Sequence, residues 1–107
     1  MKVKDFIDSF NYAVSGILSA MKLEKSLRVH YIAAIMVIGL STLFNLTRVE
    51  FMILLLTVVL VVVLEMINTA IEKTIDMITR EYHPLARVIK DVSAGAVLIA
   101  SFNAVIV

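Results

Sequence analysis

The sequence predicts an all-α membrane protein, with an N-terminal amphipathic helix in the membrane interface and three transmembrane helices. Hydrophobic residues make up 61% of the 107 residues, and the mean hydropathy is +0.98. Both exceed what soluble domains usually show. The apolar residues are also gathered into long segments, and a spanning helix needs about 20 of them. The chain length corresponds to a single domain.

The first predicted element is an amphipathic helix over residues 1–27. Between Val3 and Met21, apolar residues recur at the i, i+3, i+4, i+7 spacing that places them on one helical face. The other face carries polar side chains, among them Asp5 and Tyr12. Such a helix is typical of the boundary between membrane and water.

Three apolar segments follow, and each predicts a transmembrane helix. Their expected bounds are residues 29–47, residues 50–79 including a cytoplasmic extension, and residues 85–107. The second segment is the clearest in its length and hydropathy. His83-Pro84 separates it from the third, because the residue before a proline disfavours the helical conformation.

The basic residues predict the orientation in the membrane. Only Arg48 lies between the first two spans, whereas the other nine of the ten Lys and Arg residues precede the first span or flank the second connection: Lys2, Lys4, Lys22, Lys25, Arg28, Lys73, Arg80, Arg87 and Lys90. Positive charge concentrates on the cytoplasmic side. The N-terminus and the second connection are therefore expected in the cytoplasm. A net charge of only +1 argues against a nucleic-acid partner.

A polar stripe ends the apolar second segment. Relative to Glu65, residues Asn68, Glu72 and Asp76 lie at about −60°, −20° and +20° around a helix with 100° per residue. An acidic residue within a membrane is costly, by about 2.5–3.5 kcal/mol at a helix centre. The stripe therefore indicates a functional site at the cytoplasmic edge of the membrane.

The residue types suggest what this site could hold. Carboxylates at Glu24 and Glu72 could share Mg²⁺, which takes few protein oxygens together with substrate phosphates. Lys90 could hold a phosphate as a point charge. Glu65, about 10 Å along the helix from Glu72, could take a proton from an alcohol. The three glycines do not form a Walker A loop or a kinase glycine-rich loop.

Each feature has an alternative interpretation. Glu65 could pair with a lysine or arginine of a neighbouring helix, and Glu24 could be a solvated surface acid. Lys90 and Asp91 could form a local salt bridge, and the histidines are better explained as interfacial hydrogen-bonding groups than as metal ligands. A small oligomeric ion-coupled transporter, with Glu65 as the ion-binding carboxylate, is the rival function.

The motifs resemble the prokaryotic diacylglycerol kinase family of small membrane lipid kinases. The resemblance rests on EMINTAIE at Glu65–Glu72, EYH at Glu81–His83 and KDxxAGAVL at Lys90–Leu98, and it covers nearly the whole chain. HPLA at His83–Ala86 is similar to the Gram-positive branch, which phosphorylates undecaprenol. The resemblance implies an oligomeric helical bundle in the bacterial cytoplasmic membrane, a homotrimer with shared active sites that uses ATP and Mg²⁺.

The resemblance also implies roles for individual residues. Glu65 would accept the proton of the lipid hydroxyl, Asn68 would orient the phosphates, and Glu24 and Glu72 would bind the metal. The remaining nucleotide-binding residues would be Tyr12, Glu81, Tyr82, His83, Lys90 and Asp91. The lipid would lie along Ser26, Leu27, Arg28, Val29, His30 and Ala94. Asp5 departs from relatives with a basic residue there, so that nucleotide contact is not expected.

The expected function is therefore phosphorylation of a lipid hydroxyl. Undecaprenol is the expected acceptor, and diacylglycerol, which would yield phosphatidic acid, is the alternative. Both lipids present a hydroxyl at the interface, so the sequence does not distinguish between them.

Overall fold

The computed structural model describes residues 2–79 and 81–107, so Arg80 of the basic set lies outside the described residues. Within these ranges every regular element is an α-helix, as the sequence predicted. The helices are α1 (Val3–Leu23), α2 (Lys25–Ser41), α3 (Arg48–Ile78) and α4 (Pro84–Ile106).

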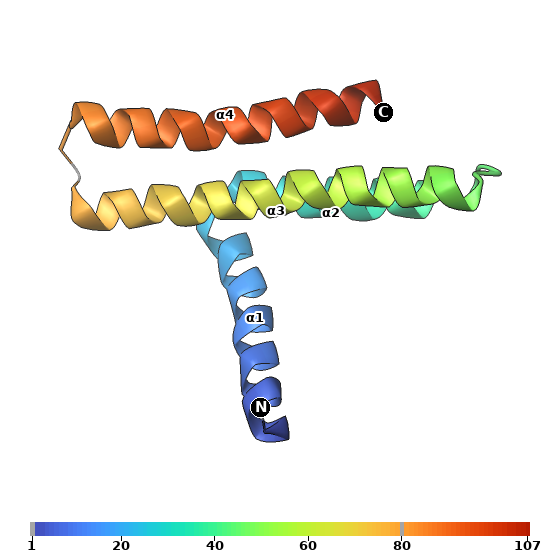
Figure 1. The fold of residues 1–107 in the computed structure, drawn as a ribbon, viewed down its shortest axis with the longest axis horizontal. Coiled ribbons are helices and arrows are strands. Elements are labelled where there is room, and N and C mark those ends of the chain that lie inside the picture. The colour runs from blue at the N-terminus through green and yellow to red at the C-terminus, as the bar shows by residue number, and fades with distance from the viewer. Residues whose placement is uncertain (1, 80) are drawn as a thin grey trace.

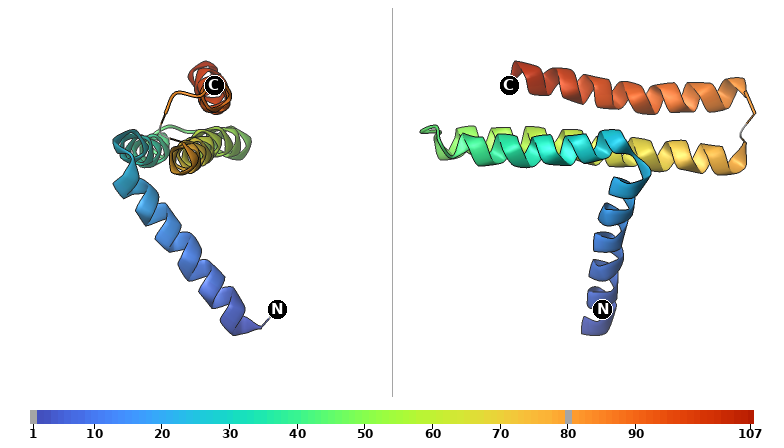
Figure 2. Two further views of the ribbon diagram at one scale, coloured as in Figure 1. Left: turned by 90° about the vertical axis from the view of Figure 1, so that its left-hand side faces the viewer. Right: turned by 180° about the vertical axis from the view of Figure 1, so that it is seen from behind.

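Helices α2, α3 and α4 run alongside one another, and α1 projects away from them at a steep angle (Figure 1). The second pair of views shows the same arrangement end-on and from behind (Figure 2). Helix α3 packs against both α2 and α4 and is antiparallel to each, whereas α1 contacts α2. Helix α3 is therefore the element around which α2 and α4 are arranged.

A single residue separates α1 from α2. Glu24 has an extended backbone, with φ −133° and ψ 123°, and its N–H donates to the carbonyl of Ala20 to close α1. Its own carbonyl accepts from the N–H of Arg28 and opens α2. The helix break therefore falls at Glu24, before the boundary expected near residue 28, and it places this acid at the junction of the two helices.

Helix α2 is shorter than the first predicted span. Its 17 residues extend about 26 Å at 1.5 Å per residue, short of the hydrocarbon core of about 30 Å. The hydroxyls of Ser41 and Thr42 donate to the carbonyls of Ile38 and Gly39 at 2.6 and 2.7 Å, which satisfies acceptors at the helix end. The helix stops there, and residues 42–46 form a turn. Among the described residues, two helices, α3 and α4, have both the length and the hydropathy of a membrane span.

Both long helices begin at defined caps. The Thr47 side chain accepts from the N–H of Glu50, and the Glu50 side chain accepts from the N–H of Thr47, so α3 opens with a capping box. Helix α4 begins at Pro84, one residue before the start expected at residue 85, with His83 as the N-cap. Proline suits this first position because it has no N–H to leave unsatisfied.

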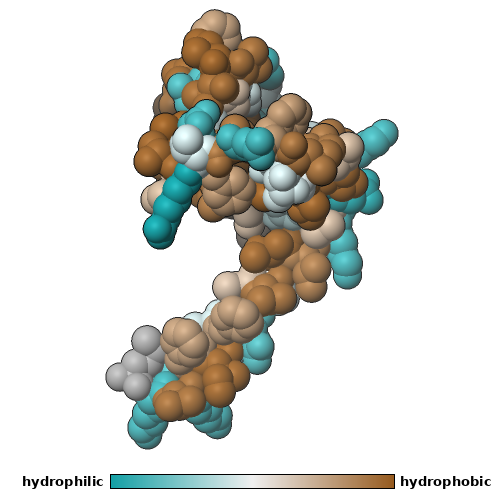
Figure 3. Space-filling view, turned by 90° about the vertical axis from the view of Figure 1, so that its right-hand side faces the viewer, coloured by the Kyte–Doolittle hydropathy of each residue, from teal (hydrophilic) through white to brown (hydrophobic). Residues whose placement is uncertain are grey.

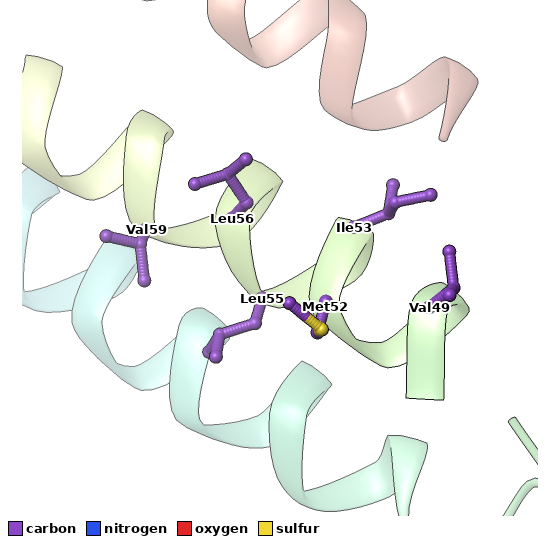
Figure 4. A pocket seen from close by; sticks show the side chains of 6 residues that line it. All are labelled: Val49, Met52, Ile53, Leu55, Leu56 and Val59. Carbon is purple, nitrogen blue, oxygen red and sulfur yellow. The ribbon is translucent and has the colours of Figure 1, made fainter. Parts of the chain in front are cut away.

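The chain has almost no apolar core of its own. Leu27 and Ala100 are the buried hydrophobic residues of the described part, and large apolar side chains of all four helices are exposed. Hydrophobic side chains cover much of the face shown in Figure 3. At the far end of α3, six apolar residues line a hollow of about 580 Å³ (Figure 4): Val49, Met52, Ile53, Leu55, Leu56 and Val59. Such a surface is suited to lipid or to further protein, not to water.

Candidate active site

The polar stripe of α3 passes from buried to half-exposed positions. Glu65 and Asn68 are each only 8% exposed, whereas Glu72 and Asp76 are partly exposed. Because these residues lie three or four positions apart, the helix carries them on one face. The stripe therefore leads from a closed environment near Glu65 toward the α3–α4 connection.

Glu65 is held by a hydroxyl of the neighbouring helix. Ser26 Oγ, in the first turn of α2, donates to Glu65 Oε1 at 3.2 Å. No Lys, Arg or His nitrogen of residues 2–79 and 81–107 lies within 4.0 Å of this carboxylate. The alternative that Glu65 pairs with a basic residue of a neighbouring helix is therefore not met within the described chain. A buried carboxylate without a cation is suited to accept a proton.

Asn68 links the buried and exposed halves of the stripe. Its Nδ2 donates to Glu72 Oε1 at 3.2 Å. Its Oδ1 is buried and has no hydrogen-bond partner among the described groups. A buried acceptor without a donor is costly, so this oxygen is a candidate contact for a donor that a substrate or a metal-bound water would bring.

Glu24 reaches α3 from the junction of α1 and α2. Its Oε1 lies 3.6 Å from Lys73 Nζ, one residue beyond Glu72. The alternative of a purely solvated acid therefore does not apply. Among the described residues no group of three or more His, Cys, Asp or Glu side chains is arranged to hold a metal ion.

Two carboxylates can be enough to bind Mg²⁺ in a protein. This ion is bound through one or two carboxylates, keeping waters and taking substrate phosphates as its other ligands. Glu24 and Glu72 each use Oε1 in the contact described above, so neither contact occupies Oε2.

Helix α4 brings charged residues to the same end. Lys90 Nζ pairs with Asp76 Oδ1 at 2.7 Å, and Arg87 Nε pairs with Asp91 Oδ1 at 3.3 Å. Lys90 and Asp91 are therefore bonded to other partners, not to each other as in the local salt-bridge alternative. A hollow of about 270 Å³ lies beside the α3–α4 connection, lined by Ile75, Asp76, Thr79, Glu81, Tyr82, His83, Ala86, Arg87 and Lys90.

The predicted site residues are gathered only in part. Glu81, Tyr82, His83 and Lys90 share one hollow, but Tyr12 lies on the projecting α1 and is 76% exposed. The single chain does not bring it to the other nucleotide candidates.

The residues expected along the lipid path also differ in their surroundings. Leu27 is fully buried and packs inside the chain, and His30 lines a small apolar hollow with residues of α3 and α4. The others lie at exposed positions: Ser26, Arg28, Val29 and Ala94.

Three residues of this region were not assigned a role in the sequence analysis. Lys73 holds Glu24, Arg87 holds Asp91, and Thr69 Oγ1 donates to the backbone carbonyl of Glu65 at 3.0 Å. The Thr69 contact joins residues four apart and could have been anticipated from helical spacing. The contact between Lys73 and Glu24 depends on how α2 packs on α3, which spacing does not provide.

Comparison with known proteins gives the family. The family model described as prokaryotic diacylglycerol kinase matches residues 11–107. This chain belongs to the prokaryotic diacylglycerol kinase family. The resemblance carried by the EMINTAIE and KDxxAGAVL motifs is thereby confirmed.

Relatives in this family carry two different names. The chain is 40% identical to a diacylglycerol kinase of Synechocystis sp. over 100 residues, 92% of this chain and 57% of the relative. It is 40% identical to the undecaprenol kinase of Bacillus subtilis over 94 residues, 88% of this chain and 76% of the relative. It is 32% identical to the diacylglycerol kinase of Escherichia coli over 100 residues, 94% of this chain and 82% of the relative.

These names describe phosphotransferases that act on lipid alcohols, and family membership favours this class over an ion-coupled transporter. The chain spans somewhat more than half the length of the Synechocystis relative. The chain is equally identical, at 40%, to a relative named diacylglycerol kinase and to one named undecaprenol kinase, so the comparisons do not select one lipid.

Proposed function

We propose that this protein is an ATP- and Mg²⁺-dependent lipid kinase that transfers a phosphoryl group to the hydroxyl of undecaprenol. The observation that carries the proposal is the environment of Glu65. Its carboxylate is nearly buried, accepts a hydrogen bond from the Ser26 hydroxyl and has no cation beside it among the described residues. Family membership supports the reaction class.

Glu65 would accept the proton of the lipid hydroxyl as that oxygen attacks the γ-phosphorus, and the bond from this phosphorus to the bridging oxygen would break to release ADP. Ser26 would keep the carboxylate in position, and Asn68 would help to orient the phosphates through a metal-bound water that donates to its Oδ1. Glu24 and Glu72 would hold Mg²⁺, which when bound neutralises negative charge on the phosphates. Glu81, Tyr82, His83, Lys90 and Asp91 would bind the nucleotide. Positioning and charge neutralisation supply most of the catalysis in such reactions.

An apolar groove lined in part by the α3 turn that precedes Glu65 supports a long-chain acceptor such as undecaprenol. Its volume is about 400 Å³, and residues of α1, α2 and α3 line it: Ile17, Met21, Tyr31, Ala34, Ile35, Ile38, Val58, Val59, Val62 and Val63. Apart from Tyr31, whose hydroxyl is buried, every lining residue is apolar. A polyprenyl chain needs no hydrogen bond there, and the apolar lining is suited to so long a hydrocarbon chain.

We also propose a homotrimer with shared active sites, in which α2, α3 and α4 all cross the membrane. The exposed apolar surface of these helices supports the proposal, as does the position of Tyr12 away from the other nucleotide candidates. The distribution of basic residues supports the further proposal that the N-terminus and the active site face the cytoplasm. The measured mass of the detergent-solubilised protein, against 11.9 kDa for one chain, tests the trimer.

The experiment that tests the acceptor is phosphate transfer from labelled ATP with Mg²⁺ in mixed micelles. One set of micelles contains undecaprenol and the other diacylglycerol at the same mole fraction. Undecaprenol is expected to be phosphorylated faster. The reverse preference would assign the protein to diacylglycerol phosphorylation, and transfer to neither lipid would contradict the kinase.

A further inference from the structure

Lys73 lies at the candidate site, and the mechanism above gives it no role. Its Nζ is 3.6 Å from Glu24 Oε1, and it directly follows Glu72 on α3. Glu24 and Glu72 are the two carboxylates proposed to hold the metal. Lys73 therefore pairs with one of the two proposed metal ligands and is adjacent in sequence to the other.

The Lys73 ion pair is the loosest of the three in the described residues. Lys90 and Asp76 approach to 2.7 Å and Arg87 and Asp91 to 3.3 Å, whereas Lys73 and Glu24 remain 3.6 Å apart. The side chains of Lys73 and Glu24 are 43% and 28% exposed. Partly exposed pairs of this kind are weak. Glu24 can therefore exchange Lys73 for a divalent cation at little cost.

Two hollows adjoin at this end of α3. Lys73 lines one of about 520 Å³, together with Leu23, Asp76 and Met77. Asp76 also lines the hollow of about 270 Å³ that holds Tyr82 and His83. An elongated ligand could therefore extend from the α3–α4 connection to Lys73.

The charged residues of the two hollows indicate which end of a nucleotide each hollow would bind. In the α3–α4 hollow, the acids Asp76 and Glu81 are balanced by the bases Arg87 and Lys90. This balance is suited to an uncharged base and ribose, not to a triphosphate. The phosphates need cations elsewhere, and Lys73 lines the adjoining hollow and pairs with Glu24, one of the proposed metal ligands.

We propose that Lys73 is a phosphate-binding residue that is held on Glu24 until the metal–nucleotide complex binds. This inference rests on the proposed kinase function and extends its nucleotide site. Glu24 exchanges the ammonium of Lys73 for the metal, and the released ammonium binds a phosphate oxygen as a point charge. The flexible lysine stem allows this change of partner without movement of α3.

The test measures binding of a fluorescent ATP analogue to the full chain in detergent, with and without Mg²⁺. Lys73→Met removes the charge and keeps the apolar stem, and is expected to weaken nucleotide binding about tenfold or more. Lys73→Arg should retain most of the affinity. Lys22→Met, at an exposed position of α1, is the matched control and should bind as the unmodified chain does.

A second readout uses Mn²⁺ alone on the nucleotide-free protein. Lys73→Met should bind Mn²⁺ more tightly, because the cation that competes for Glu24 is gone. A merely structural ion pair would instead lower the thermal stability of this variant and leave Mn²⁺ affinity no higher. If Lys73→Met does not fold, the affinities for the ATP analogue and for Mn²⁺ are measured on Lys73→Gln instead.

Unchanged affinity for both ligands in a folded Lys73 variant would overturn the role of Lys73. The proposed function would survive that result, provided that the unmodified chain still transfers phosphate to lipid. Absence of transfer and of ATP binding in the unmodified chain would instead contradict the kinase itself.

Discussion

At the scale of single residues, the contact between Ser26 and Glu65 connects structure to proposed chemistry. The two residues are 39 positions apart, and their 3.2 Å hydrogen bond forms because the first turn of α2 lies beside α3. The hydroxyl fixes one carboxylate oxygen of Glu65. In the proposed mechanism, the other oxygen would accept the proton of the lipid alcohol.

Removing this hydroxyl should slow turnover without preventing binding. Ser26→Ala is expected to lower kcat about tenfold, the effect of one hydrogen bond to a charged group, with a smaller change in the KM for ATP. Ser26→Thr, which restores a hydroxyl, should recover most of the rate. Steady-state kinetics on all three proteins measures this, and an unchanged kcat in Ser26→Ala would remove Ser26 from the mechanism.

The sequence predicted the polar stripe but not its contacts. Glu65, Asn68, Glu72 and Asp76 share a face because helical spacing alone places them there. Two ion pairs of this region join different helices. Asp76 of the stripe pairs with Lys90 of α4, and Lys73 of α3 pairs with Glu24 at the junction of α1 and α2. Such pairs depend on the packing and rotation of the helices, which one sequence does not specify.

At the scale of elements, α3 depends on its capping box at the end far from the site. Thr47→Ala removes the acceptor for the Glu50 N–H and should lower the free energy of unfolding by about 1 kcal/mol. Phosphate transfer should be retained, since Glu65 lies about 27 Å away along the helix. Thermal unfolding in detergent measures the lowered stability. Thr47→Ser keeps a hydroxyl that can cap the helix, so its stability should stay close to that of the unmodified chain.

Helix α1 should lie in the membrane interface on its apolar face. The sequence has no tryptophan, so a single introduced tryptophan reports its own surroundings. Phe10→Trp should be quenched by lipids brominated in their acyl chains. Ser15→Trp, about 140° around the helix, should be quenched much less. Equal quenching at both positions would contradict an interfacial orientation of α1.

The helix boundaries could be predicted from the sequence only in part. The start of α4 could be predicted to within one residue, because the preference of proline for the first position of a helix does not depend on tertiary packing. At the end of α2, the hydroxyls of Ser41 and Thr42 bond to carbonyls of the last turn, and hydropathy does not detect these contacts. The break at Glu24 also escaped the pattern, because residues on both sides of it favour helix.

At the scale of the whole molecule, the positive-inside distribution predicts which ends face the cytoplasm. The chain has no cysteine, so single cysteines can be labelled without background. Asn45→Cys, between α2 and α3, should react with a membrane-impermeant maleimide in intact cells. Thr79→Cys, after α3, should react only once the membrane is opened. The opposite result would reverse the orientation and place the site outside.

The central claim is that Glu65 accepts the proton of a lipid alcohol at the membrane boundary. It is tested most directly by phosphate transfer from labelled ATP to lipid, comparing the unmodified chain with Glu65→Gln at equal protein and ATP concentrations. The variant is expected to lose at least about 100-fold of the rate, as general-base catalysis predicts, while its oligomeric mass and ATP affinity stay close to those of the unmodified chain. Transfer at the normal rate by Glu65→Gln would contradict the account.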